Sequence, residues 1–480
     1  MSMASRSIIK ILIHYKSFLA GLLILAFFIG LSVYAAVTWP YDEARRMWND
    51  PSYWVEYPEY AAPAWIQRFT GKKEIEGSLV IDTTAIDRRH ISRFREVMER
   101  TIIENVYATI LYNYDVFPRS GRLEISPVVS KDSTSVLKIG INVIWSKPSG
   151  INITLFRGVI AREGITHPIY RMPGQEHPIV REYRRILREV YNVSLNVDLE
   201  PIEILFIDDK AFIESNQTNI KILKGAYRIM YSYFVVEGLK SVEIRLIFRG
   251  TVFGLLGTDA YGRDLFMGIA WGAPLALLFG LLASVLTTML TMVLSAISAW
   301  FKGAADVVTS RINEIFMILP FLPTLILIML FYGFTIWTLL IIVVILNTLG
   351  GSGLKMQRAM FLQIREMPYI EAARAYGASS FRIIFIYMIP RVMPILIPNI
   401  VVSVPSFVFL EAALAMLGIA DPTSITWGKI LEEAYSKAAL FGRAYHWILA
   451  PAVALILLSI AFALIGFTLD RVFNPRLRQL

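Results

Sequence analysis

The 480-residue sequence contains no cysteine and only five histidines. Without cysteine, the chain has no disulfide, no cysteine-ligated metal and no thiol nucleophile. Four of the histidines, His90, His167, His177 and His446, show no spacing typical of metal ligands. We therefore expect no metal site.

Several enzyme signatures are also missing. There is no G-x-x-x-x-G-K-[ST] loop, so we expect the chain not to bind ATP itself. The segment Gly350–Lys355 is rich in glycine but has the wrong spacing. Neither H-E-x-x-H nor a G-x-S-x-G elbow occurs. The sequence therefore predicts no catalytic residues and no cofactor bound by this chain.

Apolar residues are abundant. They make up 55% of the chain, and the mean hydropathy is +0.54. This composition indicates an integral membrane protein. A net charge of +9 is also found in nucleic-acid-binding proteins, but here the basic residues largely flank apolar runs. We interpret them as determinants of membrane topology.

Long runs with little or no charge predict six transmembrane helices, since about 20 apolar residues cross a bilayer. One run, Ile315–Leu354, would hold two helices with a tight turn at Gly333. The other runs are Ser17–Tyr41, Leu265–Phe301, Val392–Ala420 and Ala444–Leu469. The first run has an alternative reading as a cleaved signal peptide, with a weak cleavage site at Val33-Tyr34-Ala35. Its length favours a retained helix.

Residues 42–250 differ in composition from the rest. Charges return, and alternating stretches rich in Val, Ile, Tyr and Thr predict strands. The predicted strands are Leu79–Ile86, Ala108–Phe117, Val136–Trp145, Ile151–Ile160 and Val242–Phe248. Helices are expected near Asp87–Glu104 and Ile179–Tyr191. A soluble α+β domain of about 200 residues is large enough to hold its own core.

Sequons and basic residues predict the orientation. The three N-x-Ser/Thr sequons, at Asn152, Asn192 and Asn216, all fall in the 42–250 segment. Lys and Arg cluster at both termini and around Met367. An even number of spans puts both termini on one side, and the positive-inside rule makes that side cytoplasmic. We expect residues 42–265 to be extracellular and the three asparagines to be candidate N-glycosylation sites.

The segment Met367–Pro390 reads MPYIEAARAYGASSFRIIFIYMIP and lies between two long apolar runs. Pro368 fits the first position of a helix, and Gly377 fits a C′ residue at positive φ. Ser379 and Ser380 are good N-caps. The pattern predicts a short helix, a glycine corner and a second helix. One apolar face would carry Ile370, Ala373, Gly377, Phe381 and Ile384.

This pattern admits an ordinary amphipathic linker, but its detail is more specific. Glu371-Ala372-Ala373, three residues and then Gly377 resembles the EAA loop of binding-protein-dependent ABC importer permeases. The extended form YIEAARAYGAS is present, followed by an apolar run and Pro390. The resemblance implies a cytoplasmic coupling helix that docks into a groove on an ATPase subunit. The residues implied for ATPase coupling are Glu371, Ala372, Ala373, Gly377 and Arg382.

A second motif precedes the Leu265 span. On residues alone, it is a polar turn that fits a solvated membrane-entry loop, with Arg263 pairing with Asp259 or Asp264. It also resembles the GTDxxGRD segment of the dipeptide/oligopeptide/nickel class of permeases, specifically the second, "C"-type subunit. The residues of this outer-face motif are Gly257, Thr258, Asp259, Gly262, Arg263 and Asp264.

Further resemblance to the same class lies near the carboxy terminus, in Glu411–Leu414, Leu417-Gly418, Asp421–Thr423 and Trp427-Gly428. Altogether the resemblance covers Gly257 to about Arg478 and, more weakly, the first span. It does not cover Asp42–Gly250, where typical members have a much shorter segment.

Glu411 stands within an apolar run. A charge at mid-bilayer costs roughly 3 kcal/mol on insertion scales. We expect this side chain to face a partner, water or the translocation pathway. The alternative is that Glu411 lies near the outer end of its span and is hydrated.

The resemblance implies an all-α polytopic membrane protein with the type I ABC importer permease fold and an inserted extracellular α+β domain. The expected divisions are 1–41, 42–250 and 251–480, with the coupling loop at about 355–391. Implied partners are a second homologous permease, two cytoplasmic ATPases that use ATP and Mg²⁺, an extracellular solute-binding protein and membrane lipid, with no nucleic acid. Peptides, oligosaccharides and a metal such as nickel remain open as substrates.

Two other functions are weighed against transport. The chain has the features of a membrane sensor or receptor with an extracellular ligand-binding domain, although no cytoplasmic output domain is visible. It also fits a membrane enzyme with an active site in the outer domain, although histidine is scarce and cysteine absent. The inserted domain is expected to receive or orient the solute-binding protein, or alternatively to space the complex from a cell-surface layer.

Overall fold

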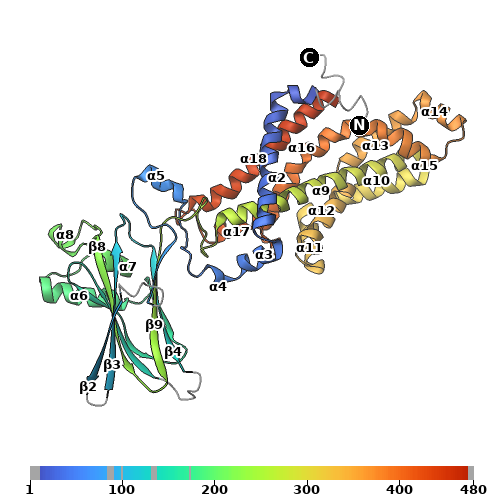
Figure 1. Cartoon of the computed structure of the whole chain (residues 1–480). Helices are drawn as coiled ribbons and strands as arrows, with labels where there is room; N and C mark the ends of the chain where they lie inside the picture. Colours follow the sequence, from blue (N-terminus) through green and yellow to red (C-terminus); the bar gives the residue numbers. More distant parts are fainter. Residues whose placement is uncertain (1–10, 84–90, 99–100, 131–137, 172–173, 474–480) are drawn as a thin grey trace. The chain divides into compact units, whose positions relative to one another are not determined.

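The computed structural model describes residues 11–83, 91–98, 101–130, 138–171 and 174–473. The chain divides into two compact units (Figure 1). The helical unit comprises Met1–Asp50 and Leu265–Leu480, and the β-rich unit comprises Pro51–Asp264. The first border falls later than residue 41 because α3 (Tyr41–Asn49) buries Ala44 and Trp48, and the Trp48 ring lies directly against Gly268 of the helical unit.

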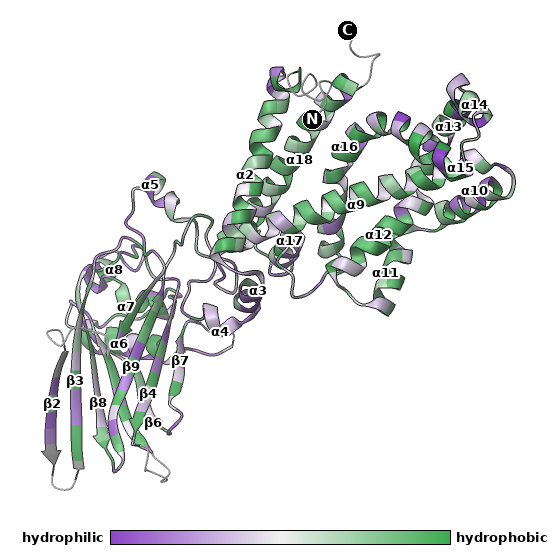
Figure 2. Ribbon diagram, turned by 45° about the vertical axis from the view of Figure 1, so that its right-hand side comes forward, coloured by the Kyte–Doolittle hydropathy of each residue, from purple (hydrophilic) through white to green (hydrophobic). Residues whose placement is uncertain are grey.

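The helical unit contains the longest apolar segments of the chain, which Figure 2 shows as largely hydrophobic helices. Besides α3, its helices are α2 (Lys16–Thr38), α9 (Leu265–Phe301), α10 (Gly303–Ile318), α11 (Phe321–Tyr332), α12 (Ile336–Gly350), α13 (Gly353–Arg365), α14 (Pro368–Ala375), α15 (Ser380–Arg382), α16 (Ile389–Met416), α17 (Trp427–Ser436) and α18 (Tyr445–Phe473).

Among the described residues, four helices are long and apolar enough to cross a membrane: α2, α9, the run Ser380–Met416 and α18. Two further pairs pass the same test together but are bent. The α10–α11 pair bends by 94° and the α12–α13 pair by 54°. Pro320 lies in the first break, where its missing N–H and ring oppose a continuous helix. Gly333, with φ of 89°, lies between α11 and α12, where the sequence predicts a tight turn.

Small residues allow the helices to pack closely. Helix α16 packs along both α9 and α18, and α2 packs against α18 and α9. A Cβ on Gly21 of α2 would lie 2.7 Å from the Ala461 carbonyl oxygen, and one on Gly466 would lie 2.4 Å from Val402. Membrane helices associate largely through such contacts, because lipid supplies little hydrophobic driving force between them.

The β-rich unit has two antiparallel sheets, with strand orders β1-β9-β4-β7 and β2-β3-β8-β5-β6. Its strands are β1 (Ser78–Asp82), β2 (Ile91–Met98), β3 (Thr101–Tyr112), β4 (Ser120–Val129), β5 (Ile139–Ser146), β6 (Asn152–Ile160), β7 (Ile165–Ile169), β8 (Gly225–Val235) and β9 (Leu239–Arg249). Its helical segments are α4 (Pro51–Trp54), the 3-10 turn η1 (Ala64–Ile66), α5 (Gln67–Thr70), α6 (Pro178–Tyr191), α7 (Pro201–Phe206) and α8 (Asp209–Glu214).

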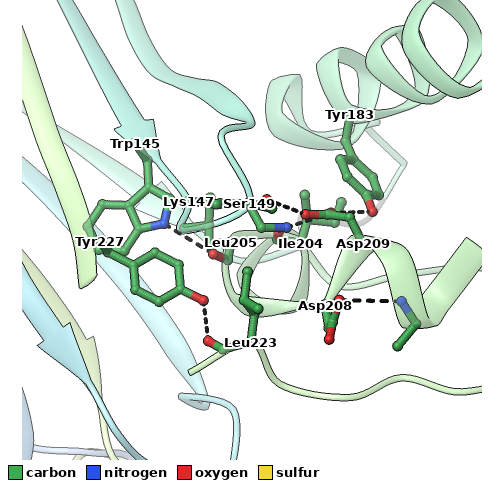
Figure 3. A network of polar contacts seen from close by, with 11 residues as sticks. Trp145, Lys147, Ser149, Tyr183, Ile204, Leu205, Asp208, Asp209, Leu223 and Tyr227 are labelled. Atoms are coloured by element: carbon green, nitrogen blue, oxygen red, sulfur yellow. Dashed lines mark hydrogen bonds and ion pairs between the residues drawn. The ribbon is translucent and has the colours of Figure 1, made fainter. Parts of the chain in front are cut away.

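Both sheets and the helices α6 to α8 contribute to one core. Side chains alternate along the strands, so β5 buries Ile139, Ile141, Val143 and Trp145 on the inner face. The Trp145 ring stacks on Tyr227 with centroids 5.3 Å apart. Its indole N–H donates to the Leu205 carbonyl over 3.1 Å, which ties the sheet to α7 (Figure 3).

The expected helix at Asp87–Glu104 is wrong where the structure describes it. Residues Ile91–Met98 form β2, and Glu104 lies within β3, which pairs antiparallel with β2. The segment contains helix-forming Arg, Glu and Met, but pairing with β3 overrides that local preference. The other predicted helix is confirmed as α6, and β1, β3, β5, β6 and β9 overlap the five predicted strands.

An ion pair is fully buried in the same core, between Lys147 after β5 and Asp209 at the start of α8. The Lys147 ammonium lies 2.7 Å from the Asp209 carboxylate. The carboxylate also accepts hydrogen bonds from the Ser149 and Tyr183 hydroxyls, each over 2.8 Å, as Figure 3 shows. A buried charge pair is stable only when its remaining hydrogen-bonding capacity is satisfied, and these contacts supply that.

Candidate functional site

The segment Met367–Pro390 forms the helix, corner and helix that the sequence predicts. Pro368 begins α14, which ends at Ala375. Gly377 follows with φ of 76°, the left-handed conformation that glycine adopts without strain. The Ser379 hydroxyl accepts a hydrogen bond from the Arg382 N–H and caps α15. A π-helix, Ile383–Met388, then leads into α16.

One face of α14 is buried. Ile370 is fully buried and Ala373 is 9% exposed, and both belong to a cluster with Met292 and Ala296 of α9 and Phe361 of α13. This cluster continues through the π-helix into α16, so the buried face of α14 belongs to a core that it shares with α9, α13 and α16.

The predicted apolar face does not continue across the corner. Ile384 is buried, but Phe381 is 64% exposed and Gly377 is also exposed. The first helix ends at the corner and a second helix starts after it, so residues three or four apart across the corner do not share a helix face. Phe381 instead lies beside Phe301, at the end of α9, with ring centroids 6.5 Å apart.

Polar contacts fasten the same region to the end of α9. The Arg374 guanidinium lies over the Trp300 ring, 4.2 Å from its centroid. Arg365 donates to the Ala299 carbonyl over 3.2 Å, and Lys302 lies 3.7 Å from Glu366. Sequence analysis did not single out Trp300; the available signal was an aromatic residue at the end of an uncharged run.

The opposite face of α14 is exposed. Glu371, Ala372 and Ala375 are exposed along the helix, and Tyr376 at its end is 92% exposed. Glu371 occupies the first turn, where a carboxylate interacts favourably with the helix dipole. Four of the five predicted coupling residues are therefore exposed, namely Glu371, Ala372, Gly377 and Arg382, and Ala373 is buried.

The outer-face motif forms a buried turn rather than a solvated loop. Thr258 and Asp259 are fully buried and Arg263 is 5% exposed. The Asp259 carboxylate accepts hydrogen bonds from the backbone N–H groups of Tyr261 and Arg263 and, over 2.5 Å, from the Arg263 guanidinium. Burial raises the pKa of Asp259, although the Arg263 charge opposes that shift. The motif therefore holds its own backbone in shape.

Gly257 and Gly262 both have positive φ, and Asp264 pairs with Thr258 through an isolated β-bridge. A Cβ on Gly262 would lie 3.0 Å from the Tyr57 carbonyl oxygen. The Thr258 hydroxyl donates to the Pro58 carbonyl over 2.5 Å and accepts from the Ala61 N–H. These contacts explain the spacing of the six motif residues, which together fold the turn and pack it against Tyr57, Pro58 and Ala61.

Glu411 lies near the end of α16 and is only 8% exposed. It faces the start of α17, where its carboxylate lies close to Gly428. A Cβ on Gly428 would lie 2.6 Å from the Ala412 Cα and 3.2 Å from the Glu411 carboxylate, so glycine is required for α17 to approach. Helices α14 and α17 lie at opposite ends of the helical unit (Figure 1).

The motif Trp427-Gly428 also holds the helices together. Trp427 is buried and its indole N–H donates to the Ile269 carbonyl of α9 over 3.0 Å. Its ring lies 5.5 Å from that of Phe28 in α2. Asp421 accepts from the Thr423 N–H over 2.9 Å, and Thr423 in turn accepts from Arg45 of α3. These residues thus join α2, α3, α9 and α17.

The three sequon asparagines are exposed on the β-rich unit. Asn152 begins β6, Asn192 follows α6, and Asn216 follows α8. Asn192 and Asn216 each have φ of 54°. Gln217 links their two loops, because it donates to the Ser194 carbonyl and accepts from the Asn196 N–H.

Comparison with known proteins identifies relatives of the helical unit. Residues 291–479 match the family model of the binding-protein-dependent transport system inner membrane component. Over 221 residues, the chain is 32% identical to a protein of Brucella suis biovar 1 named as a peptide permease, which covers 46% of this chain and 72% of that protein.

Two further comparisons each match part of the chain. The dipeptide transport system permease protein DppC of Bacillus subtilis is 28% identical over 226 residues, covering 46% of this chain and 69% of that protein. An inward-facing structure of the MetNI methionine ABC transporter matches 43% of this chain and 95% of its own, with 18% identity and a TM-score of 0.34. The chain belongs to the family of binding-protein-dependent transport system inner membrane components.

Proposed function

We propose that this chain is a permease subunit of an ATP-driven importer of peptides. The names of its relatives, which include a peptide permease and a dipeptide permease, support peptides over oligosaccharides or a metal. Family membership favours transport over the sensor and membrane-enzyme alternatives. The two bent helix pairs would each act as one span, which gives six spans in all.

The observation that carries the proposal is the two-sided packing of α14. One side is buried against α9, α13 and the π-helix, while the other presents Glu371, Ala372 and Tyr376 to a partner. An ATPase that docks on the exposed side would displace α14 when it closes. Because Arg374 and Ile370 hold α14 on the end of α9, that displacement would pass into the membrane helices.

The proposed complex contains a second homologous permease, two cytoplasmic ATPases and an extracellular solute-binding protein. ATP and Mg²⁺ would be bound by the ATPases, and this chain would bind no cofactor. Both termini would be cytoplasmic, and the β-rich unit would face outwards with glycans at Asn152, Asn192 and Asn216. Exposure of all three asparagines supports that orientation, because a transferase must reach them.

A cross-linking experiment tests the docking role. The chain has no cysteine, so a Tyr376→Cys variant carries one reactive thiol. In the assembled complex, a short bifunctional reagent should link that thiol to the ATPase. The matched control is Tyr332→Cys, which is 77% exposed at the end of α11. Cross-linking of the control but not of Tyr376→Cys would rule out the proposed docking face.

Orientation is tested with single cysteines beside Asn152 and at Arg374. The first should react with a membrane-impermeant maleimide in intact cells, and the second only after permeabilisation. The reverse labelling pattern would overturn the proposed topology. Loss of mobility shift in an Asn152→Gln, Asn192→Gln, Asn216→Gln triple variant would show whether the sequons carry glycans.

A further inference from the structure

The break between α12 and α13 lies directly against α10. Gly350 ends α12, Gly351 lies in the break and Gly353 begins α13, and all three belong to the glycine-rich run that has the wrong spacing for a phosphate loop. A Cβ on Gly350 would lie 3.0 Å from the Phe316 carbonyl oxygen of α10. The glycine therefore allows the α10 backbone to approach the break at the point where the two helices bend by 54°.

Where a helix is interrupted, the carbonyl oxygens of its last turn lose the backbone N–H groups that would otherwise bond to them from four residues later. In a membrane such groups must be satisfied internally, because lipid offers no hydrogen bonds. Here Asn313 of α10 supplies the partners. It is fully buried, and its side-chain NH₂ donates to the Leu349 carbonyl over 2.5 Å and to the Gly351 carbonyl over 3.2 Å.

A second contact holds α13 beyond the break. Arg358 of α13 forms a bidentate ion pair with Asp306 of α10, with N–O distances of 2.5 and 2.6 Å. The Ser298 hydroxyl of α9 donates to the same carboxylate over 2.6 Å. Asp306 and Asn313 are seven residues apart and so lie on one face of α10. Helix α10 thus contacts the α12–α13 pair in two places, at the break through Asn313 and in α13 through Asp306.

We infer that Asn313 is a positioning residue that locks the α12–α13 bend, so that movement of α13 reaches α12 instead of being absorbed at the break. This inference rests on the coupling role proposed for α14, because α13 shares the buried cluster of α14 through Phe361. Without the two donors of Asn313, the freed carbonyls would favour other backbone arrangements. The bend would then vary as the coupling region moves.

The test measures the bend directly. Ile341 on α12 and Met356 on α13 are 59% and 52% exposed, and a double cysteine variant places spin labels on both sides of the break. Distances are measured by pulsed electron resonance in the assembled complex, without nucleotide and after trapping with ATP and vanadate. The test compares the wild-type background with Asn313→Leu, which keeps the side-chain size and removes both donors.

The wild-type background should give one narrow distance distribution in both states. Asn313→Leu should broaden the distribution or shift it on trapping, and should lower the peptide transported per ATP by roughly fivefold, the population shift expected from one ordinary hydrogen bond. The probe is a defined mixture of dipeptides and tripeptides. The matched control is Asn347→Leu, since Asn347 donates to Val343 within its own helix.

Three results would overturn the inference: a narrow and unchanged distribution in Asn313→Leu, equal broadening in Asn347→Leu, or a wild-type bend that changes on trapping. If Asn313→Leu does not assemble, Gly350→Leu provides a second route, because its side chain would push α10 away from the break. A wild-type complex that hydrolyses ATP without moving any of these peptides would instead count against the proposed function.

Discussion

At the scale of single residues, Gly377 is constrained by its backbone and not by its surroundings. Its φ is 76°, yet no atom lies within 4 Å of where a Cβ would stand. A β-branched residue in this conformation costs of order 1–3 kcal/mol, whereas asparagine tolerates it. The position therefore separates backbone strain from steric crowding.

We predict that Gly377→Val uncouples ATP hydrolysis from transport while the complex still assembles. The strained corner would relax by moving α14, so peptide-stimulated ATPase activity should fall severalfold. Gly377→Asn is the matched control and should retain most of that stimulation. Equal activity in the valine and asparagine variants would exclude the corner as a coupling element.

The buried pair Lys147–Asp209 gives a prediction about stability. Lys147→Met leaves the Asp209 charge buried without its cation, which costs roughly 3–5 kcal/mol of folding stability. The β-rich unit should therefore unfold at a clearly lower denaturant concentration. Unfolding is monitored by tryptophan fluorescence, to which Trp145 contributes because its ring packs in the same core. The double variant Lys147→Met, Asp209→Leu removes both charges and should recover part of the loss; no recovery would argue against an electrostatic cause.

At the scale of elements, long apolar runs were predictable because bilayer thickness fixes their length. The run Leu265–Phe301 corresponds to α9 residue for residue. Bends within the Ile315–Leu354 run were not, because they depend on which side chains of other helices satisfy the broken backbone. Asn313 gives no such indication in the sequence. Likewise β2 carries helix-forming residues, and only its pairing with β3 makes it a strand.

The contact between α14 and α9 should depend on Trp300. Removing its ring in Trp300→Ala ends the cation–π contact with Arg374, which is worth about 0.5–2 kcal/mol. We predict a partial loss of peptide-stimulated ATPase activity with unchanged assembly. Trp337→Ala on α12, where the side chain is 55% exposed, is the control. If both variants behave alike, the Trp300 contact does not transmit movement.

At the scale of the whole molecule, the candidate site was predictable in part. The order of residues in Glu371–Gly377 fixed a helix and a corner, since Pro368 and Gly377 act locally. The partners of that helix were not predictable, because Trp300 contacts Arg374 from α9, more than seventy residues earlier in the chain. For the same reason Asp259 and Arg263 suggested a solvated turn, while contacts with Pro58 and Ala61 bury it.

The two sheets can be excised at the point where the entering and the leaving chain lie side by side. The chain enters the sheets after Gly77 and leaves them before Gly250, and the Gly250 N–H donates to the Gly77 carbonyl over 2.8 Å. The segments on either side are joined as well, since Thr251 and Val252 donate to the Ile75 carbonyl. A two-residue linker can therefore replace Ser78–Arg249 without disturbing Thr258 and its contacts with Pro58 and Ala61.

We predict that this shortened chain still assembles with the proposed permease and ATPase partners but binds the proposed solute-binding protein, loaded with peptide, more weakly. A unit of this size offers far more than the ~800 Å² that each partner contributes to a standard interface. Affinity is measured as binding of the complex in nanodiscs to a surface that carries the immobilised solute-binding protein. Uptake is measured in proteoliposomes with the same peptide mixture as substrate. The control replaces only Glu189, an exposed residue of α6, by alanine. If affinity and uptake both match the intact chain, the unit does not receive the binding protein, and a spacing role at the cell surface becomes the better account.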